Sequence, residues 1–354
     1  MTVAVHASAE HDPGARGRAF GHSFADRLVS SWDAYGRVFA EHGVSDGLVR
    51  RVGDETLAAL ENWAPLLAAE LRGIAHGSGL EPWQAAALNA RSEVLAAADA
   101  LTPGECSTSV FVPSTGAPLT IQTWDWHHAT GDTLLIWQYE PLPGRTVKTF
   151  TEFGLLAKIG VSSAGLGVHF NLLQHVSDGG QVGIPVHLLA RQILDRATSC
   201  DEAEALVRSA RVSASVALTV VEYDGNRGNA CTLEVSPAGV VRLAPDEHGY
   251  LQHTNHFLDA ELAGGERLGT EDPDTYARMS ALGQRTAALS GGDFMTRLQA
   301  LVQHREDGSA LCCHPDQESP WQTHVVVGLD VATGGLQLHD GAPCTASPDR
   351  VAVV

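Results

Sequence analysis

The sequence has little positive charge. Its 354 residues include 23 Lys and Arg against 42 Asp and Glu, which gives a formal net charge of -19. Such an acidic chain lacks the basic surface that replaces counterions on nucleic acid or on an anionic membrane. We therefore expect a small-molecule partner, and we expect neither nucleic acid nor membrane as a partner.

Long apolar runs and a secretory leader are missing too. No stretch of about 18 apolar residues occurs, and the first twenty residues contain no basic segment followed by an apolar one. Cysteine is also sparse, with six residues and no CxxC pair, which excludes a disulfide scaffold. These absences predict a cytoplasmic protein with free thiols.

Histidine is abundant, but its arrangement does not favour a metal site. His127 and His128 are neighbours on an expected strand and would face opposite sides, and His253 and His256 also point apart. No HExxH motif is present. The Cys312-Cys313-His314 run is interpreted as a structural or pocket-edge feature, with an oxidisable vicinal pair as the alternative. We expect no metal and no cofactor.

The order of expected elements favours an α+β fold. Apolar stripes with helical spacing dominate the first hundred residues, one through Phe20, Leu28 and Phe39 and one through Leu57, Leu67 and Ile74. After Pro103-Gly104 the chain becomes rich in β-branched and aromatic residues, which favours antiparallel strands. We expect strands at 107–112, 119–126, 133–139, 147–153, 167–173, 215–223, 230–235, 240–243, 250–257, 323–329 and 335–339, and helices at 82–98, 184–198, 201–209, 274–288 and 293–303. Antiparallel sheets covered by helices follow from this order.

Cys106 stands between a helix-breaking segment and an expected strand. Thr102-Pro103-Gly104-Glu105 precedes it and Ser107-Thr108-Ser109 follows it. A cysteine in such a loop can be reactive, and an inert buried thiol is the alternative.

Four motifs give the chain a family resemblance. These are Gly104-Glu-Cys-Ser-Thr-Ser109, Gln122-Thr-Trp-Asp-Trp126, the segment from Lys158 to Asn171, and His253-Thr-Asn-His-Phe257. In order and spacing they resemble the acyl-coenzyme A:6-aminopenicillanic acid acyltransferase family and, more distantly, the choloylglycine hydrolases. The resemblance implies an N-terminal-nucleophile fold, a four-layer αββα sandwich of antiparallel sheets covered by helices.

The resemblance also implies that the chain cleaves itself between Glu105 and Cys106. Residues 1–105 would form a small helical chain, and residues 106–354 would form the catalytic chain with Cys106 at its start. The α-amine of such a cysteine, with a pKa near about 8, can take the proton of its own thiol. Glu105 stands where family members often carry Gly, and its carboxylate could either slow or assist the cleavage.

The remaining site residues are assigned by their match to the family motifs. Asp125 lies on an expected strand 19 residues after Cys106, the distance for a strand, a turn and a return to the same end of the sheet. The family places an aspartate there to hold the nucleophile; a solvent-exposed strand end is the alternative. Asn255 and Asn171 match oxyanion donors, although Asn171 could cap a turn. Arg278 matches an arginine near the nucleophile, with a solvated helix position as its alternative.

Three aromatic side chains are assigned to the substrate pocket. Trp124 and Trp126 flank Asp125 and would face the other side of the strand, where they line either the core or the pocket. His256 follows Asn255 and is placed in the pocket as well.

Together these residues predict an amidase that cleaves an N-acyl or aminoacyl amide through an acyl-enzyme on Cys106. An acyltransferase that moves an acyl group from a thioester or amide to an amine uses the same residues. A non-catalytic, uncleaved binding protein and a thiol-redox protein built on Cys312 and Cys313 are the alternatives from other classes. The expected partner is a small-molecule amide or thioester, and the protomer is two chains from one precursor, alone or as a homo-oligomer.

Overall fold

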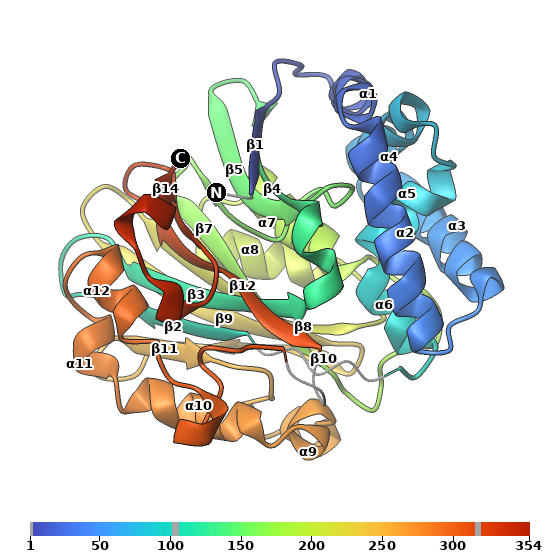
Figure 1. Ribbon diagram of the computed structural model, residues 1–354. Coiled ribbons are helices and arrows are strands. Elements are labelled where there is room, and N and C mark those ends of the chain that lie inside the picture. The colour runs from blue at the N-terminus through green and yellow to red at the C-terminus, as the bar shows by residue number, and fades with distance from the viewer. Residues whose placement is uncertain (1–2, 101–105, 316–319) are drawn as a thin grey trace.

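The computed structural model describes residues 3–100, 106–315 and 320–354. Glu105, on one side of the expected cleavage site, therefore lies outside the described residues. Two stacked sheets form the centre of the molecule (Figure 1). The first sheet, which we call sheet A, has eight strands, and the second, sheet B, has six.

Among the described residues, the paired strands of both sheets are antiparallel except β1 with β4. Sheet A runs in the order β1 (Ala4–Ala7), β4 (Leu134–Leu142), β5 (Arg145–Glu152), β6 (Ile159–Ser162), β7 (Leu166–Leu173), β8 (Ser215–Tyr223), β9 (Gly228–Ser236) and β10 (Gly239–Leu243). Sheet B runs in the order β11 (Tyr250–His253), β2 (Ser107–Phe111), β3 (Leu119–His127), β12 (Trp321–Asp330), β13 (Gly335–Asp340) and β14 (Val351–Val353).

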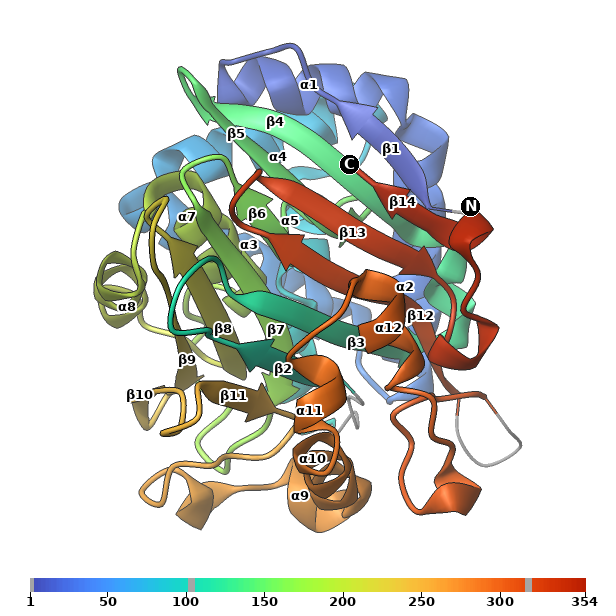
Figure 2. The same cartoon turned by 90° about the vertical axis from the view of Figure 1, so that its left-hand side faces the viewer.

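Helices cover the outer faces of both sheets (Figures 1 and 2). Helices α7 (Val186–Arg196) and α8 (Cys200–Arg208) contact sheet A, while α10 (Asp274–Gly283), α11 (Thr286–Leu289) and α12 (Phe294–Gln299) contact sheet B. The short α9 (Leu268–Glu271) precedes α10. Strands β2, β12 and β13 contact β5, β6 and β7 across the space between the sheets. The layer order is thus αββα, and the predicted α+β sandwich is confirmed.

In the described part of the chain, six helices precede the first strand of sheet B. They are α1 (Pro13–Ser23), α2 (Ala25–Glu41), α3 (Asp46–Trp63), α4 (Pro65–Ser78), α5 (Pro82–Asn89) and α6 (Arg91–Ala97). The ring of Phe20 stacks on Trp137 of β4 with 4.4 Å between ring centroids. Asn89 donates to the carbonyl oxygen of Gly154 at 2.7 Å and accepts from the backbone N–H of Leu156 at 2.9 Å. The helical segment therefore shares one hydrophobic core with the sheets.

Several element boundaries differ from the sequence-based expectations. Strands β1, β6 and β14 were not expected, since three or four residues are too few to display an alternating pattern. The helices expected over 82–98 and 274–288 are each divided in two. The strand expected over 250–257 ends at His253, because the backbone N–H of Asn255 donates to Oγ1 of Thr275 rather than to a strand.

The described helices are all too short or too polar to cross a lipid bilayer.

Candidate active site

A β-hairpin brings Cys106 and Asp125 to one end of sheet B. Ser107 of β2 lies opposite Thr123 of β3, and its backbone N–H donates to Oγ1 of Thr123 at 3.2 Å. Cys106 immediately precedes β2 and Asp125 follows Thr123 by two residues, so both lie at the same end of the hairpin. Asp125 is fully buried, which rules out the solvent-exposed alternative.

Two side chains from distant elements hold the carbonyl oxygen of Cys106. Nδ2 of Asn171, on β7, donates to it at 3.1 Å, and Nη1 of Arg278, on α10, donates to it at 2.9 Å. Arg278 also donates to Oγ of Ser107 at 3.2 Å. Both side chains are completely buried, so Arg278 is not a solvated helix residue and Asn171 does not cap an exposed turn. The backbone of Cys106 is therefore fixed from two sides.

Asn255 is linked to the same group through Arg278. Its Oδ1 accepts from Nη1 and Nη2 of Arg278 at 3.1 and 3.2 Å, and its Nδ2 donates to the carbonyl oxygen of Leu172 at 2.9 Å. An amide nitrogen has two donor hydrogens. Among the described residues, Asn255 uses one of them, whereas Asn171 uses both, on Cys106 and on the carbonyl oxygen of His253 at 3.3 Å.

Asp274 orients Arg278, a contact that the motif comparison missed. Its Oδ2 accepts from Nε of Arg278 at 3.0 Å. The two residues are four positions apart on α10, a spacing at which opposite charges on a helix pair, so the sequence did contain the signal. Because Asp274 occupies the Nε edge, the Nη groups of Arg278 remain directed at Cys106 and Asn255.

The thiol of Cys106 is protonated at neutral pH in the intact chain. Burial is the largest cause, and it raises the pKa of the thiol to about 12, with a further increase from the Asp125 carboxylate. The backbone N–H of Asp125 and the charges of Arg278 and Lys158 act in the opposite direction. Cys106 is also only 4% exposed. The intact chain thus holds Cys106 as a buried, protonated thiol.

A buried charged cluster, comprising Arg91, Glu152 and Lys158, lies between the sheets within electrostatic reach of Cys106. Glu152 pairs with both cations, and its pKa lies well below its usual range because these charges and hydrogen bonds outweigh burial. Burial lowers the pKa of Lys158 to about 7. Single charges within apolar runs were the available signal, but the sequence did not indicate that they pair.

The three expected pocket residues lie in different surroundings. Trp124 and Trp126 are buried members of the main core, and Nζ of Lys158 lies 3.6 Å from the centroid of the Trp124 ring. The core alternative therefore describes both tryptophans. His256 packs against Tyr276, and burial lowers its pKa to about 4. His253 instead pairs with Glu234 at 2.8 Å, so the two histidines have different partners.

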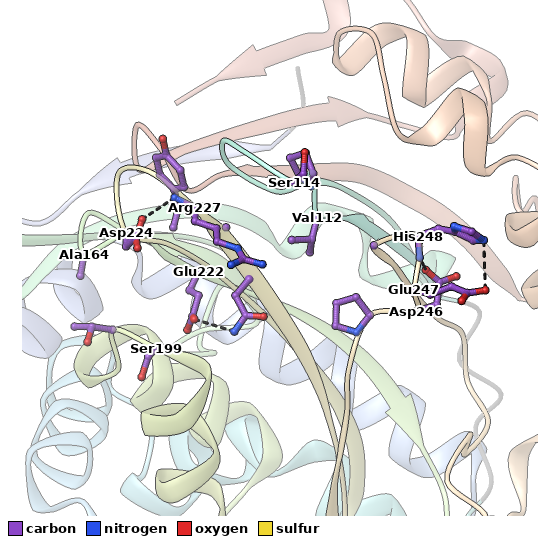
Figure 3. A pocket seen from close by; sticks show the side chains of 17 residues that line it. Val112, Ser114, Ala164, Ser199, Glu222, Asp224, Arg227, Asp246, Glu247 and His248 are labelled. Carbon is purple, nitrogen blue, oxygen red and sulfur yellow. Dashed lines mark hydrogen bonds and ion pairs between the residues drawn. The ribbon is translucent and has the colours of Figure 1, made fainter.

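A large cavity lies remote from this group. It measures about 900 Å³ and is lined by Val112, Ser114, Ser199 and the turns around Arg227 and His248 (Figure 3). Val112 follows the opposite end of β2, roughly 20 Å from Cys106 at the rise of an extended strand. Nearer the site, a cavity of about 20 Å³ borders Leu172. This cavity has room for no more than one water molecule.

Comparison with known proteins identifies the family. The model of the family described as acyl-coenzyme A:6-aminopenicillanic acid acyl-transferase matches residues 113–310, which include Asp125, Asn171, Asn255 and Arg278 but not Cys106. The acyl-coenzyme A:6-aminopenicillanic-acid-acyltransferase 40 kDa form of Emericella nidulans is 31% identical over 244 residues. That match covers 68% of this chain and 65% of the fungal protein, just under two thirds of its length.

Among solved structures, penicillin V acylase from Agrobacterium tumefaciens aligns with a TM-score of 0.46 and 15% identity, over 66% of this chain and 83% of that one. The family assignment rests on the sequence matches. The chain belongs to the acyl-coenzyme A:6-aminopenicillanic acid acyltransferase family.

Proposed function

We propose that the chain cuts itself between Glu105 and Cys106, and that the freed Cys106 cleaves an N-acyl or aminoacyl amide through an acyl-enzyme. The observation that carries this proposal is the convergence of Asn171 and Arg278 on the carbonyl oxygen of Cys106. Two buried polar side chains, from elements 65 and 172 residues away in the sequence, fix the backbone of one cysteine. An inert core thiol needs no such support.

The cleavage step follows from the chemistry of a thiol beside its own peptide bond. Sγ of Cys106 attacks the carbonyl carbon of Glu105, the carbon–nitrogen bond breaks, and the proton that leaves the thiol ends on the nitrogen, which becomes a free α-amine. The acyl group of Glu105 is then held on sulfur as a thioester, which water hydrolyses. Fixing the carbonyl of Cys106 limits the motion of the residue during the attack.

After cleavage the α-amine of Cys106 supplies a base beside its own thiol. With a pKa near about 8 it can accept the thiol proton at neutral pH. The thiolate attacks the substrate carbonyl, the amine product leaves with a proton from the α-ammonium group, and water resolves the acyl-enzyme. Asn255, with an N–H not used among the described residues, is the better oxyanion donor, and Asn171 positions Cys106.

Acyl transfer is a second candidate, supported by the name of the fungal relative. The fungal protein is named for a transfer from acyl-coenzyme A to 6-aminopenicillanic acid. In this chain the same acyl-enzyme would be resolved by an amine rather than by water. Adding a primary amine to the reaction distinguishes the two, because a transferase forms a new amide at the expense of the free acid.

Intact mass spectrometry tests the proposal. Wild-type protein should appear as two fragments that divide between Glu105 and Cys106, while Cys106→Ala should remain one chain. Cys231→Ala, which removes another buried cysteine, is the matched control and should cleave normally. If the wild type also stays whole under conditions in which it is folded, the self-processing mechanism is wrong and an uncleaved binding protein is the remaining interpretation.

A further inference from the structure

Four potential metal ligands meet at the surface of sheet B, outside the candidate active site. They are His304, Cys312, His314 and Cys344, and one nitrogen or sulfur atom from each lies within 4.8 Å of all the others. The sequence did not indicate this group, because Cys344 is 32 residues from Cys312 and the spacing matches no zinc motif.

The backbone explains how these ligands come together. The chain reverses at the short helix η3 (Arg305–Asp307) and at Gly308, whose φ of 115° suits glycine. The backbone N–H of Cys312 consequently donates to the carbonyl oxygen of Gln303 at 2.9 Å. Cys344 arrives from the turn η4 (Pro343–Thr345), and its backbone N–H donates to Sγ of Cys312 at 3.4 Å.

Two distances within the group match a tetrahedral site. Nε2 of His314 lies 3.2 Å from Sγ of Cys344 and 3.4 Å from Sγ of Cys312. Around a tetrahedral zinc ion, with Zn–S near about 2.3 Å and Zn–N near about 2.0 Å, neighbouring sulfur and nitrogen ligands are about 3.5 Å apart. All four ligand atoms lie within 4.8 Å of one another, so the more distant pairs would have to move together by up to about 1 Å around an ion.

The surroundings also suit a cation. Oδ2 of Asp307 lies 3.9 Å from Nδ1 of His304, which places a negative charge beside the site. A cavity of about 310 Å³, lined by His304, Cys312 and His314, gives access from solvent. Two thiols with two imidazoles are a donor set that favours zinc over calcium or magnesium, which prefer oxygen ligands.

We propose that His304, Cys312, His314 and Cys344 form a structural zinc site that fastens residues 303–314 to the connection between β13 and β14. With four protein ligands the site has no open position for a substrate, so its role is to hold the chain. The inference is independent of the proposed amidase reaction.

The fastened segment touches the residue that orients Arg278. The backbone N–H of Ala310 lies 3.3 Å from both carboxylate oxygens of Asp274. Cys313 and Thr323 also exchange two hydrogen bonds, at 2.9 and 3.0 Å, and Thr323 pairs with Asp125 in the sheet. Zinc would therefore order a segment that supports Asp274 on one side and the Asp125 strand on the other.

Metal analysis of protein purified without a polyhistidine tag and under reducing conditions tests the proposal. We expect about one zinc ion per chain in the wild type, either as purified or after addition of zinc chloride alone. The zinc bound per chain should be at least about tenfold lower in Cys344→Ser and in His314→Ala. Cys231→Ser and His248→Ala remove a thiol and an exposed imidazole elsewhere and should keep the zinc. Cobalt substituted for zinc should give thiolate charge-transfer absorption in the wild type and not in Cys344→Ser.

Zinc should also raise the unfolding temperature of the metal-free wild type but not that of Cys344→Ser, and circular dichroism checks that the variants fold. Failure of the reduced wild type to take up zinc, or equal uptake by both ligand variants, would overturn the proposal. A disulfide between Cys312 and Cys344 in the freshly isolated protein, seen by mass under non-reducing conditions, would do so too. None of these readouts depends on cleavage at Cys106.

Discussion

Arg278 donates a hydrogen bond to the carbonyl oxygen of Cys106 at 2.9 Å while its Nε donates to Asp274 at 3.0 Å. One guanidinium thus joins an ion pair on α10 to the backbone of the candidate nucleophile. The planar group, with five donors in a fixed arrangement, contacts Asp274, Asn255, Ser107 and Cys106 at once.

Replacing this guanidinium by an ammonium should slow self-cleavage. Lysine keeps the charge but cannot reach all four partners, so we expect Arg278→Lys to cleave at least about tenfold more slowly than the wild type. Time courses of fragment formation on denaturing gels measure the effect. Arg285→Lys, a half-buried position at the end of the same helical region, is the control and should cleave at the wild-type rate. Equal cleavage rates for Arg278→Lys and Arg285→Lys would contradict a role for the guanidinium group of Arg278.

The two asparagines should differ in which step they affect. Asn255→Asp keeps the oxygen acceptors for Arg278 but removes the amide donor, so kcat should fall about 10²-fold to 10³-fold with a smaller change in KM. Asn171→Asp removes the donor to Cys106 and should mainly slow self-cleavage. Cleavage rates, and the kinetics of the cleaved protein with an N-acyl amide accepted by the wild type, separate the effects. If Asn171→Asp cleaves at the wild-type rate and loses only turnover, the proposed role of Asn171 in positioning Cys106 for cleavage is wrong.

Alkylation of Cys106 should depend steeply on pH in the uncleaved protein. Since the pKa of the thiol is raised to about 12, the thiolate fraction and the rate of reaction with iodoacetamide should increase about tenfold per pH unit from pH 7 to pH 9 without a plateau. Peptide mapping of an uncleaved variant that retains Cys106 and its neighbouring side chains measures that site separately from the exposed Cys344. A plateau below pH 9 would mean that the thiol is not desolvated as described.

Glu93 should make stability decrease as pH rises. Burial raises the pKa of its carboxyl to about 8 from 4.5, so between these values the folded state binds a proton that the unfolded state lacks. Stability from this group is complete below about pH 4.5 and is lost as pH rises through about 8, at up to about 1.4 kcal/mol per pH unit. Because the backbone N–H of Val186 donates to Oε1 of Glu93 at 2.8 Å, glutamine can keep that contact.

Urea unfolding of the wild type and Glu93→Gln at pH 5 and pH 8.5 measures this difference. The free energies of unfolding should be similar at pH 5, and the variant should be the more stable protein at pH 8.5. The comparison cancels other titrating groups common to both proteins. An unchanged difference at the two pH values would show that Glu93 is ionised in the folded state throughout this range.

Local sequence patterns predicted the local parts of the fold. The hairpin that returns Asp125 to Cys106 follows from strand length and turn residues, both of which lie within about twenty positions. By contrast, the parallel pairing of β1 with β4 joins Ala4 to Leu135, and no local pattern determines that register. The αββα arrangement was expected through the family resemblance rather than from the pattern alone.

In the candidate site, too, local motifs predicted the residues but not the long-range contacts between them. Asp125, Asn171, Asn255 and Arg278 were identified by motif, yet their hydrogen bonds could not be, because each depends on the packing of separate elements. Asn171, which matches an oxyanion donor by motif, donates to the carbonyl oxygen of Cys106 in the intact chain. The Arg91, Glu152 and Lys158 cluster, and the four potential zinc ligands, likewise form only when distant segments meet.

The common core of the first six helices and the two sheets has a consequence for a protein cleaved before Cys106. Phe20 against Trp137, and Arg91 against Glu152, would then be contacts between two separate polypeptides. Unfolding would release both, and refolding would become a reaction of second order that dilution slows. The cleaved protein should therefore melt at a temperature that rises with protein concentration, whereas the uncleaved Cys106→Ala variant, if monomeric, should melt at one temperature at every concentration.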